Sequence, residues 1–305
     1  MAVCFDMTPT VHRPVLLYET IEALAVRHGS RVVDATFGGG GLSRALCERY
    51  GAGIALVGID ADAGAIRRGE EAFENSSCRI QFFTSNFSDL ETMLDRAGYV
   101  SVEGIAFDLG LSSDQLERSG RGFSFRRDEP LTMTFAEDDA GGITAEEIVN
   151  GWSEAALRSI LAAYGEERFA GRISRSIVES REHRTIVSTR DLVEVIEQAV
   201  PQGYRQRRIH PATKTFQALR MAVNDEVTAL ERGLQGAFRR LSAGGRLAVI
   251  AFHSLEDRIV KSYFREWERN EAGRRITKKP IRPSREEELE NPRSRSAKLR
   301  VMEKL

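Results

Sequence analysis

A glycine loop after a short apolar strand is the first part of this chain that could bind a cofactor. Residues 31–43 read Arg-Val-Val-Asp-Ala-Thr-Phe-Gly-Gly-Gly-Gly-Leu-Ser, a strand that runs into four glycines and then into a helix. Glycine lets the backbone approach a ligand closely and adopt positive φ, and a helix N-terminus offers free N–H donors. Four adjacent glycines also fit a flexible strand-to-helix turn, so the loop alone does not name a ligand.

A carboxylate at the end of the next apolar run narrows the choice of cofactor. Asp60 lies in residues 57–62, Val-Gly-Ile-Asp-Ala-Asp, at the spacing where a carboxylate grips a nucleoside ribose. Ser43 replaces the last glycine of the dinucleotide-binding pattern, and Asp34 ahead of the loop suits a cationic sulfonium amino acid better than a pyrophosphate. The pattern therefore favours S-adenosylmethionine over NAD.

Two more strand ends carry candidate residues. Phe87 follows the third predicted strand, where an adenine ring could stack on it, although packing in the core explains an aromatic residue there equally well. Asp108 ends the fourth strand and begins residues 108–115, Asp-Leu-Gly-Leu-Ser-Ser-Asp-Gln. A carboxylate that ends an apolar strand at a ligand-binding edge is costly without a task, so Asp108 is a candidate functional residue rather than a loop cap.

The elements that must position these residues follow an alternating α/β order. Ser88 followed by Glu91 predicts a capping box at the start of the third helix. Alternation of this kind indicates a parallel, Rossmann-like sheet with crossover helices, whose strands end at one ligand-binding edge. The predicted strands are residues 31–36, 54–60, 79–84 and 104–109, and the predicted helices between them are 42–50, 63–74 and 88–97.

The α/β order is interrupted between residues 111 and 216. We predict a sheet domain formed by residues 1–110 and 217–305, with an inserted helical domain at 111–216. The insertion contains predicted amphipathic helices at 154–164, 168–181 and 189–199. The order then resumes with a helix at 225–241, a strand at 246–252 and a helix at 255–267, followed by two β-compatible pieces, 274–279 and 297–302, that could close the sheet edge as a hairpin.

The net charge of the 305-residue chain is only -1, so the distribution of charge is more informative than its sum. Residues 198–224 contain no Asp or Glu. A solvated face is the ordinary explanation of a charge cluster, but this stretch also carries His210, Pro211 and Phe216. We therefore interpret its basic residues as phosphate contacts to RNA, namely Arg205, Arg207, Arg208, Lys214 and Arg220.

Cysteine usage and apolar runs predict no further class of site. Cys4, Cys47 and Cys78 are odd in number and form no CxxC pair, so we expect buried free thiols and neither a disulfide framework nor a metal site. The N-terminal residues do not resemble a signal peptide, and no apolar run approaches the roughly 20 residues of a membrane span. We expect a cytoplasmic protein.

Seven blocks of the sequence together resemble the bacterial 16S ribosomal RNA cytosine-N4 methyltransferases. They occur in that family's order and span nearly the whole chain, and the last three are the most specific. The blocks are His12-Arg-Pro-Val-Leu-Leu17, Asp34-Ala-Thr-Phe-Gly-Gly-Gly-Gly41, Asp108-Leu-Gly-Leu-Ser-Ser113 with Gln115, Arg121-Gly-Phe-Ser-Phe125, His210-Pro-Ala-Thr-Lys-Thr-Phe-Gln-Ala-Leu-Arg220, Phe252-His-Ser-Leu-Glu-Asp-Arg-Ile-Val260 and Asn291-Pro-Arg-Ser-Arg-Ser-Ala-Lys-Leu-Arg300.

This resemblance implies a class I methyltransferase sheet and a defined reaction. The expected reaction is S-adenosylmethionine-dependent methylation of N4 of a cytosine in the decoding centre, at the site facing peptidyl-tRNA. The expected partner is 16S ribosomal RNA within the small ribosomal subunit. Position by position, the family's cofactor contacts fall on Gly40, Gly41, Leu42, Asp60, Phe87, Asp108 and Gln115.

The chain departs from the family at two places. Leu42 stands where the family usually has His, so a backbone contact to the cofactor would survive whereas a side-chain contact would be lost. Residues 130–135, Pro-Leu-Thr-Met-Thr-Phe, also differ from the family pattern, which makes the substrate contacts of that loop harder to carry over.

The amino group of cytosine is a poor nucleophile because its lone pair is delocalised into the ring, so the reaction needs an acceptor that orients or deprotonates it. Asp108, with the backbone carbonyls of Leu109 and Gly110, is our candidate acceptor. His253 follows the strand after the insertion and is the second candidate, although a helix-start residue with local hydrogen bonds is an equal alternative. A flipped base would also need aromatic stacking, which Phe123 or Phe125 could supply unless they pack in the core.

Two rival functions fit the sequence less well. A non-catalytic ribosome-assembly factor would keep the fold and bind RNA without methyl transfer, but it would not need the set of Asp34, Asp60 and Asp108. An NAD-dependent dehydrogenase is disfavoured by Ser43 and by the basic insertion.

Overall fold

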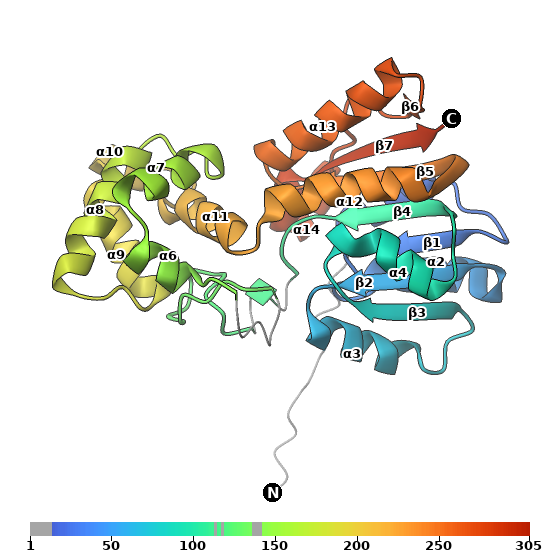
Figure 1. Cartoon of the computed structure of the whole chain (residues 1–305), viewed down its shortest axis with the longest axis horizontal. Coiled ribbons are helices and arrows are strands. Elements are labelled where there is room, and N and C mark those ends of the chain that lie inside the picture. Colours follow the sequence, from blue (N-terminus) through green and yellow to red (C-terminus); the bar gives the residue numbers. More distant parts are fainter. Residues whose placement is uncertain (1–13, 113–114, 117–118, 136–141) are drawn as a thin grey trace, which may run out of the picture.

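The structure is a computed structural model of the chain, and it describes residues 14–112, 115–116, 119–135 and 142–305. Its centre is a seven-stranded sheet in the order β3-β2-β1-β4-β5-β7-β6 (Figure 1). The first five strands are parallel, and β7 is antiparallel to both of its neighbours. The strands are β1 (Arg31–Asp34), β2 (Ala55–Asp60), β3 (Arg79–Thr84), β4 (Val102–Asp108), β5 (Leu241–Ala251), β6 (Gly273–Arg275) and β7 (Lys298–Lys304).

This sheet confirms the predicted class I methyltransferase fold. The strand order reverses between β1 and β4, and in open α/β sheets the ligand site lies outside the carboxyl ends of the strands at such a switch point. The last two β-compatible pieces do pair with each other, but β7 also pairs with β5 and so lies inside the sheet, leaving β6 as the edge strand.

Helices cover both faces of the sheet because successive strand residues point to opposite sides. Val32, Leu56 and Ala106 pack against the first helical layer, whereas Val33, Val57 and Ile105 pack against the second. The first layer is α1 (Leu17–Leu24), α2 (Gly41–Tyr50) and α3 (Ala63–Phe73), and the second is α4 (Leu90–Ala97), α12 (Glu226–Arg240) and α13 (Ser254–Arg269). Short helices η1 (Gly51–Gly53), η2 (Phe87–Asp89), α14 (Arg285–Glu290) and η3 (Pro292–Ser296) complete this unit.

The insertion forms a helical unit with its own apolar core, which stands beside the sheet in Figure 1. The expected domain boundary at 216/217 falls inside one helix, because Phe216, Ala218 and Leu219 all belong to the helical core. The helical unit thus extends to the end of that helix. Its helices are α6 (Ala145–Gly151), α7 (Glu154–Ala163), α8 (Ala170–His183), α9 (Thr189–Ala199), α10 (Gln202–Arg205) and α11 (Ala212–Val223).

Two local expectations were wrong, and the first concerns the start of α4. Ser88 lies within η2, whose cap is Asn86, and the N-cap of α4 is Asp89 with no side-chain cap hydrogen bond. Glu91 instead pairs with Arg239 of α12. A tertiary partner for the glutamate therefore replaces the local capping box.

The second correction concerns the cysteines. Cys47 in the last turn of α2 and Cys78 immediately before β3 form a disulfide, with their Cα atoms 5.6 Å apart, so the expectation of free thiols at these two positions was wrong. The chain brings them together because α2 ends beside the start of β3. Cys4 lies outside the described residues.

No helix in the described part of the chain is both long enough and apolar enough to cross a membrane.

The disulfide gives a first prediction. It closes a loop of 31 residues, for which loop-closure entropy corresponds to roughly 3–4 kcal/mol of stabilisation. Replacing both Cys47 and Cys78 with Ser should lower the free energy of unfolding of the oxidised protein by about 2–4 kcal/mol in urea titrations. The parent treated with reductant should behave like the double variant. Equal midpoints for parent and variant under non-reducing conditions would contradict this expectation.

Candidate active site

Three aspartates stand at the carboxyl ends of adjacent parallel strands. Asp34 ends β1, Asp60 ends β2 and Asp108 ends β4. The strand register places Asp34 opposite Gly58 of β2 and Ala106 of β4, so the three carboxyl groups are gathered at one edge of the sheet. This is the edge at which the sequence predicted a cofactor.

Two glycines of the loop lie so close to neighbouring side chains that a residue with a Cβ atom would not fit there. A Cβ atom at Gly40 would lie 2.5 Å from the ring of Phe37, and one at Gly41 would lie 2.1 Å from Pro14. Gly40 also has a φ of +70°, in the left-handed region. The glycines at these two positions are therefore required by packing as well as by any ligand, whereas a Cβ at Gly39 would meet open space.

The N-terminus of α2 offers backbone donors at the predicted cofactor positions. The N-cap of α2 is Gly40, which has no side chain to cap the helix. The first intrahelical hydrogen bond runs from the Arg44 N–H to the Gly40 carbonyl. The N–H groups of Gly41 and Leu42 thus have no intrahelical acceptor. The Leu42 side chain packs against the apolar layer of α1–α3, so a family contact made by the backbone can persist at this position.

Asp60 holds the loop in addition to facing the cofactor edge. One of its oxygens accepts the Gly38 N–H at 2.7 Å and the other accepts the Asp62 N–H at 2.8 Å. Burial raises the pKa of Asp60, and these two backbone donors act in the opposite direction. A ribose would therefore meet a carboxylate whose position is already fixed.

The other two aspartates differ in how their burial is compensated. Asp34 is 3% exposed and accepts a hydrogen bond of 2.8 Å from the Ser43 hydroxyl, and burial raises its pKa to about 6. Asp108 has an oxygen, Oδ1, that is buried without a hydrogen-bond partner in the described structure. Burial, followed by the nearby charges of Asp34 and Glu256, raises the pKa of Asp108 to about 8. A pKa in this range favours the protonated carboxyl group at neutral pH in the ligand-free protein.

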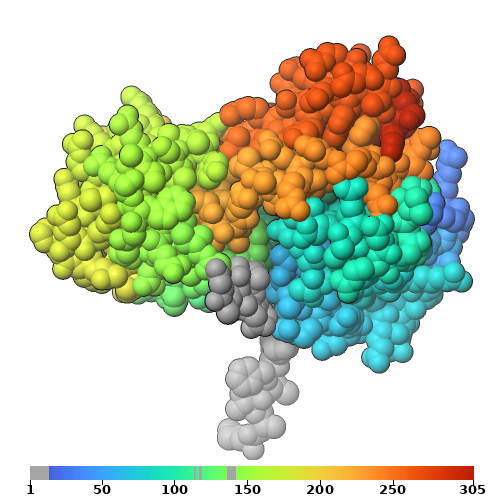
Figure 2. All heavy atoms as spheres, in the orientation of Figure 1, coloured from blue at the N-terminus to red at the C-terminus, as the bar shows by residue number. Residues whose placement is uncertain are grey.

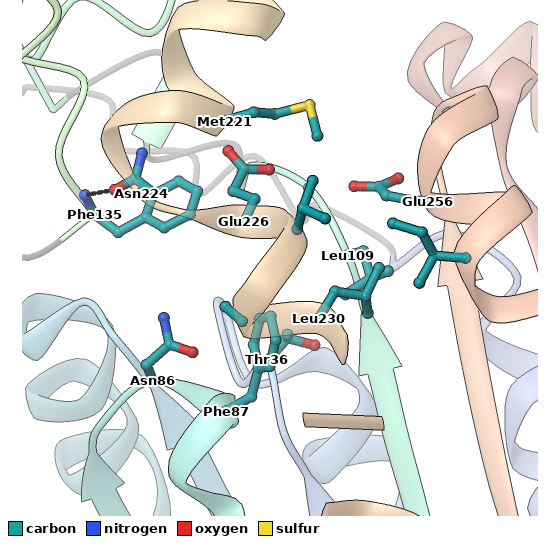
Figure 3. Close-up of a pocket in the computed structure, with 14 residues that line it drawn as sticks. Thr36, Asn86, Phe87, Leu109, Phe135, Met221, Asn224, Glu226, Leu230 and Glu256 are labelled. Atoms are coloured by element: carbon teal, nitrogen blue, oxygen red, sulfur yellow. Dashed lines mark hydrogen bonds between the residues drawn. The ribbon is translucent and has the colours of Figure 1, made fainter. Parts of the chain in front are cut away.

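A cavity of about 50 Å³ lies beyond the ends of β3 and β4, under the first turns of α12 and α13 (Figure 3). Typical ligand pockets are roughly 300–1,000 Å³, so this cavity is a small part of any complete site. Phe87 lines it, while packing edge-to-face on Phe107 with ring centres 5.4 Å apart. Phe87 thus lies at the predicted edge of the sheet and also packs in the core. Stacking of an adenine on it stays a prediction.

Two glutamates face each other in the upper part of this cavity in Figure 3. Glu226 comes from the start of α12 and accepts two hydrogen bonds from the Arg220 guanidinium, at 2.6 and 2.7 Å. Glu256 comes from the first turn of α13. Although burial opposes its charge, His253 and Arg220 hold the pKa of Glu256 below its usual value. The sequence analysis had not singled out either glutamate, although Glu256 lies inside block 252–260, one of the blocks that carry the family resemblance.

His253 is the N-cap of α13, as the alternative reading of its position allowed. Its Nδ1 accepts the Glu256 N–H at 3.3 Å, and Glu256 accepts the His253 N–H in return. Its Nε2 lies 3.0 Å from a Glu256 oxygen without the geometry of a hydrogen bond. The ligand atoms of Glu226, His253 and Glu256 lie within 4.8 Å of one another, a spacing that would suit a cation, but Arg220 already supplies a positive charge to Glu226.

The remaining predicted residues are placed as follows. Gln115 is 8% exposed, and its side-chain oxygen accepts the Ser112 N–H. Phe123 stacks on Phe135, and Phe125 stacks on His210, so both phenylalanines pack in the helical unit. Phe135, which the sequence had not singled out, lines the cavity instead.

The predicted RNA-binding residues do not form one group. Arg205, Arg207 and Arg208 are exposed around α10, with Arg207 lying over the Tyr204 ring at 5.2 Å. Lys214 donates to the Glu166 carbonyl from the exposed side of α11. Arg220 is paired with Glu226 and its side chain is only 11% exposed, so this position favours a role beside the cavity over a phosphate contact.

Comparison with known proteins gives a consistent picture. The family model described as the MraW methylase family matches residues 9–305. Ribosomal RNA small subunit methyltransferase H of Symbiobacterium thermophilum is 43% identical over 309 aligned positions, which cover 96% of this chain and 96% of that protein. The protein of the same name from Thermomicrobium roseum is 45% identical, over 98% of this chain and 95% of its own length. That of Heliobacterium mobile is 43% identical, over 96% and 99%.

Asp60 holds the glycine loop and is the predicted ribose contact, which gives a prediction. Asp60→Ala should weaken binding of S-adenosylmethionine in calorimetric titrations. It should also lower the free energy of unfolding by about 1–3 kcal/mol, because the N–H groups of Gly38 and Asp62 lose their acceptor. Glu70→Ala, at an exposed position of α3, is the matched control. Equal cofactor affinity in parent and Asp60→Ala would remove Asp60 from the site.

The buried carboxyl of Asp108 predicts an unusual dependence of stability on pH. The folded protein keeps this proton up to about pH 8, whereas an unfolded aspartate loses it near pH 4. The cofactor-free parent therefore loses stability through this group as pH rises from about 4 to 8. In Asp108→Asn that loss is absent. The free energy of unfolding of the variant, relative to that of the parent, should therefore increase across this pH range and stay constant above it. Urea unfolding at pH 5, 6.5 and 8 measures the difference, and a constant offset at all three values would sink the assignment.

Proposed function

The chain belongs to the MraW methylase family, and we propose that it transfers the methyl group of S-adenosylmethionine to N4 of a cytosine in the decoding centre of 16S ribosomal RNA. The observation that carries the proposal is the Asp108 carboxyl group at the switch point of the sheet, whose oxygen Oδ1 is buried and unpartnered among the described residues. The names of the relatives support ribosomal RNA of the small subunit as the substrate. The resemblance of the motifs supports cytosine N4 and the site that faces peptidyl-tRNA.

The residues at the edge fit this cofactor by charge and by hydrogen-bonding capacity. The N–H groups at the start of α2 would meet its carboxylate, and Asp60 would meet its ribose. Asp34 and Asp108 would offset its positive charge, because burial raises the pKa of both carboxyl groups and a cation beside them would lower it again. When bound, S-adenosylmethionine supplies an electrophilic methyl group on a positively charged sulfur.

We assign to Asp108 the role of the acceptor that the chemistry needs. With its proton lost, the free oxygen can accept a hydrogen bond from the N4 amine of the target cytosine and direct the nitrogen lone pair toward the methyl carbon. Transfer of the methyl group would leave N4 positively charged, and Asp108 would take the proton that N4 must then lose. The neighbouring Leu109 and Gly110 line the cavity.

The base must leave its stack to reach this edge, and the helical unit is the part of the chain suited to hold the surrounding RNA. Arg205, Arg207 and Arg208 are exposed there and would contact phosphates. Lys214, also on the helical unit, would add to them. The proposed partner is therefore 16S ribosomal RNA in the small subunit, bound by the helical unit while one cytosine enters the sheet edge.

Nucleoside mass spectrometry of small-subunit RNA tests the function. RNA from cells that lack this protein should lose one N4-methyl mark on cytosine, and the purified protein with S-adenosylmethionine should restore it to isolated small subunits. Binding of the cofactor and of subunits without any transfer would instead support the non-catalytic assembly factor.

The role of Asp108 predicts a specific kinetic defect. Asp108→Asn keeps the size of the side chain but cannot take a proton, so at saturating cofactor its methylation rate should fall by about 10²–10⁴-fold. Asp95→Asn, which removes an exposed carboxylate from α4, should leave the rate unchanged. If Asp108→Asn binds the cofactor more weakly but reaches the parental rate once saturated, Asp108 is only a binding residue. The acceptor would then be sought at the Leu109 and Gly110 carbonyls or at His253.

A further inference from the structure

A second hollow lies on the helical unit, outside the site described above. It has a volume of about 340 Å³, within the range of roughly 300–1,000 Å³ that is typical of ligand pockets. It lies between α7 and α8, which are adjacent in Figure 1. Its side chains are mainly basic, namely Arg158, Arg168, Arg172 and Arg175, with Phe169 and one acid, Glu154.

The charge of this hollow is not balanced within the part of the chain that the structure describes. Glu154 lies 3.9 Å from Arg175, at the limit of an ion pair. Arg158, Arg168 and Arg172 are exposed and have no carboxylate within ion-pair distance among the described residues. Arg172 and Arg175 are three residues apart on α8, and Arg168 lies in the turn just before this helix. All three line the same hollow, so their positive charges repel one another. A bound anion would relieve this repulsion.

An aromatic pair joins the hollow to residues 198–224, the stretch that contains no Asp or Glu. The guanidinium groups of Arg168 and Arg172 lie 5.6 and 5.9 Å from the centre of the Phe169 ring. Phe169 packs edge-to-face on Tyr204 with ring centres 4.8 Å apart, and Arg207 lies over the other ring of the pair. The basic residues of α7 and α8 therefore continue into those around α10.

A single buried glutamate fixes this arrangement. Glu167 is 4% exposed, and its two oxygens accept the Phe169 N–H at 2.7 Å and the Tyr204 hydroxyl at 2.9 Å. Because the Phe169 backbone and the Tyr204 hydroxyl are bound to one carboxylate, the arginines that lie over the two rings start from a preorganised surface. Ordering the surface on binding then costs less conformational entropy.

We propose that this hollow binds the phosphodiester backbone of the RNA substrate, as a phosphate site additional to Arg205, Arg207 and Arg208. A guanidinium group presents paired N–H donors that match phosphate oxygens, and three such groups without acidic partners surround one hollow. The identification of the anion as RNA rests on the proposed function. The alternative of an acidic protein segment is an outcome of the test below.

The test uses the full chain and a fluorescein-labelled 20-nucleotide RNA that contains no cytosine. Arg158→Gln, Arg168→Gln and Arg172→Gln are combined in one variant. The matched control combines Arg265→Gln, Arg269→Gln and Arg285→Gln, which are exposed arginines of α13 and α14 outside the helical unit and also without ion pairs in the described structure. Both variants lose three positive charges. Fluorescence anisotropy at several KCl concentrations gives the slope of log affinity against log salt.

The hollow variant should show a slope shallower by about 2, because each lost phosphate contact on a single strand removes about 0.7. The control should keep the parental slope within about 0.5. Arg172→Glu alone should weaken binding further than Arg172→Gln, and parental affinity for S-adenosylmethionine in every variant shows that the fold is kept. Because the probe has no cytosine, this result does not depend on whether N4 methylation occurs.

Two results would overturn the proposal. One is a slope in the hollow variant equal to that of the control. The other is parental RNA binding by the hollow variant together with lost binding of a labelled poly-glutamate peptide, which would assign the hollow to an acidic protein segment.

In the methylation assay the hollow variant should raise KM for small subunits while kcat stays at the parental value, as expected for a contact remote from the reacting atoms.

Discussion

The burial of carboxyl groups at one edge of the sheet is the constraint on which the rest of the site depends. A buried carboxylate is costly unless hydrogen bonds or a positive charge compensate it. For Asp34 the Ser43 hydroxyl does so, and for Asp60 the backbone N–H groups of Gly38 and Asp62 do so. Asp108 has no such partner for one of its oxygens. In the proposed function the cofactor would supply a positive charge, and the substrate amine would supply the hydrogen-bond donor that this oxygen lacks.

The same constraint explains how the helical unit is joined to the sheet. Arg220 belongs to α11 of the helical unit, and it pairs with Glu226 of α12 in a buried position. Asp225, between the two helices, has a φ of +44°, which turns the chain sharply at this junction. Removal of either partner of the ion pair would leave a buried charge without its counterpart, so the junction and the cavity beneath it are stabilised together. RNA bound by the helical unit, as proposed, would in this way be connected to the edge where the cofactor is expected.

The sequence predicted what depends on local pattern. The strands that end at Asp60 and Thr84, the start of α3 and the whole of α9 lie where their apolar periodicity indicated. What it could not predict depends on partners distant in the chain. Glu91 forms a pair with Arg239 of α12 in place of a local cap, and Arg220, predicted to contact an RNA phosphate, is paired with Glu226.

The disulfide and the cavity glutamates were missed for the same reason. Cys47 and Cys78 lack any spacing motif and meet only because α2 ends beside β3. Glu226 and Glu256 come from different helices and are brought to one cavity by the packing of α12 and α13 on the sheet. For the site as a whole, the strand-end aspartates and the glycine loop could be read from the sequence, whereas the residues that surround them required the tertiary structure.

The most direct test of the central claim is the number of protons released when the cofactor binds. Calorimetric titrations at pH 7 in buffers of different ionisation enthalpy give this number for S-adenosylmethionine and for S-adenosylhomocysteine, whose sulfur is uncharged. If the Asp108 proton is held only until a positive charge arrives, the charged ligand should release on the order of one proton more than the neutral one, and Asp108→Asn should abolish the difference. Equal proton release by the two ligands in the parent would contradict the account.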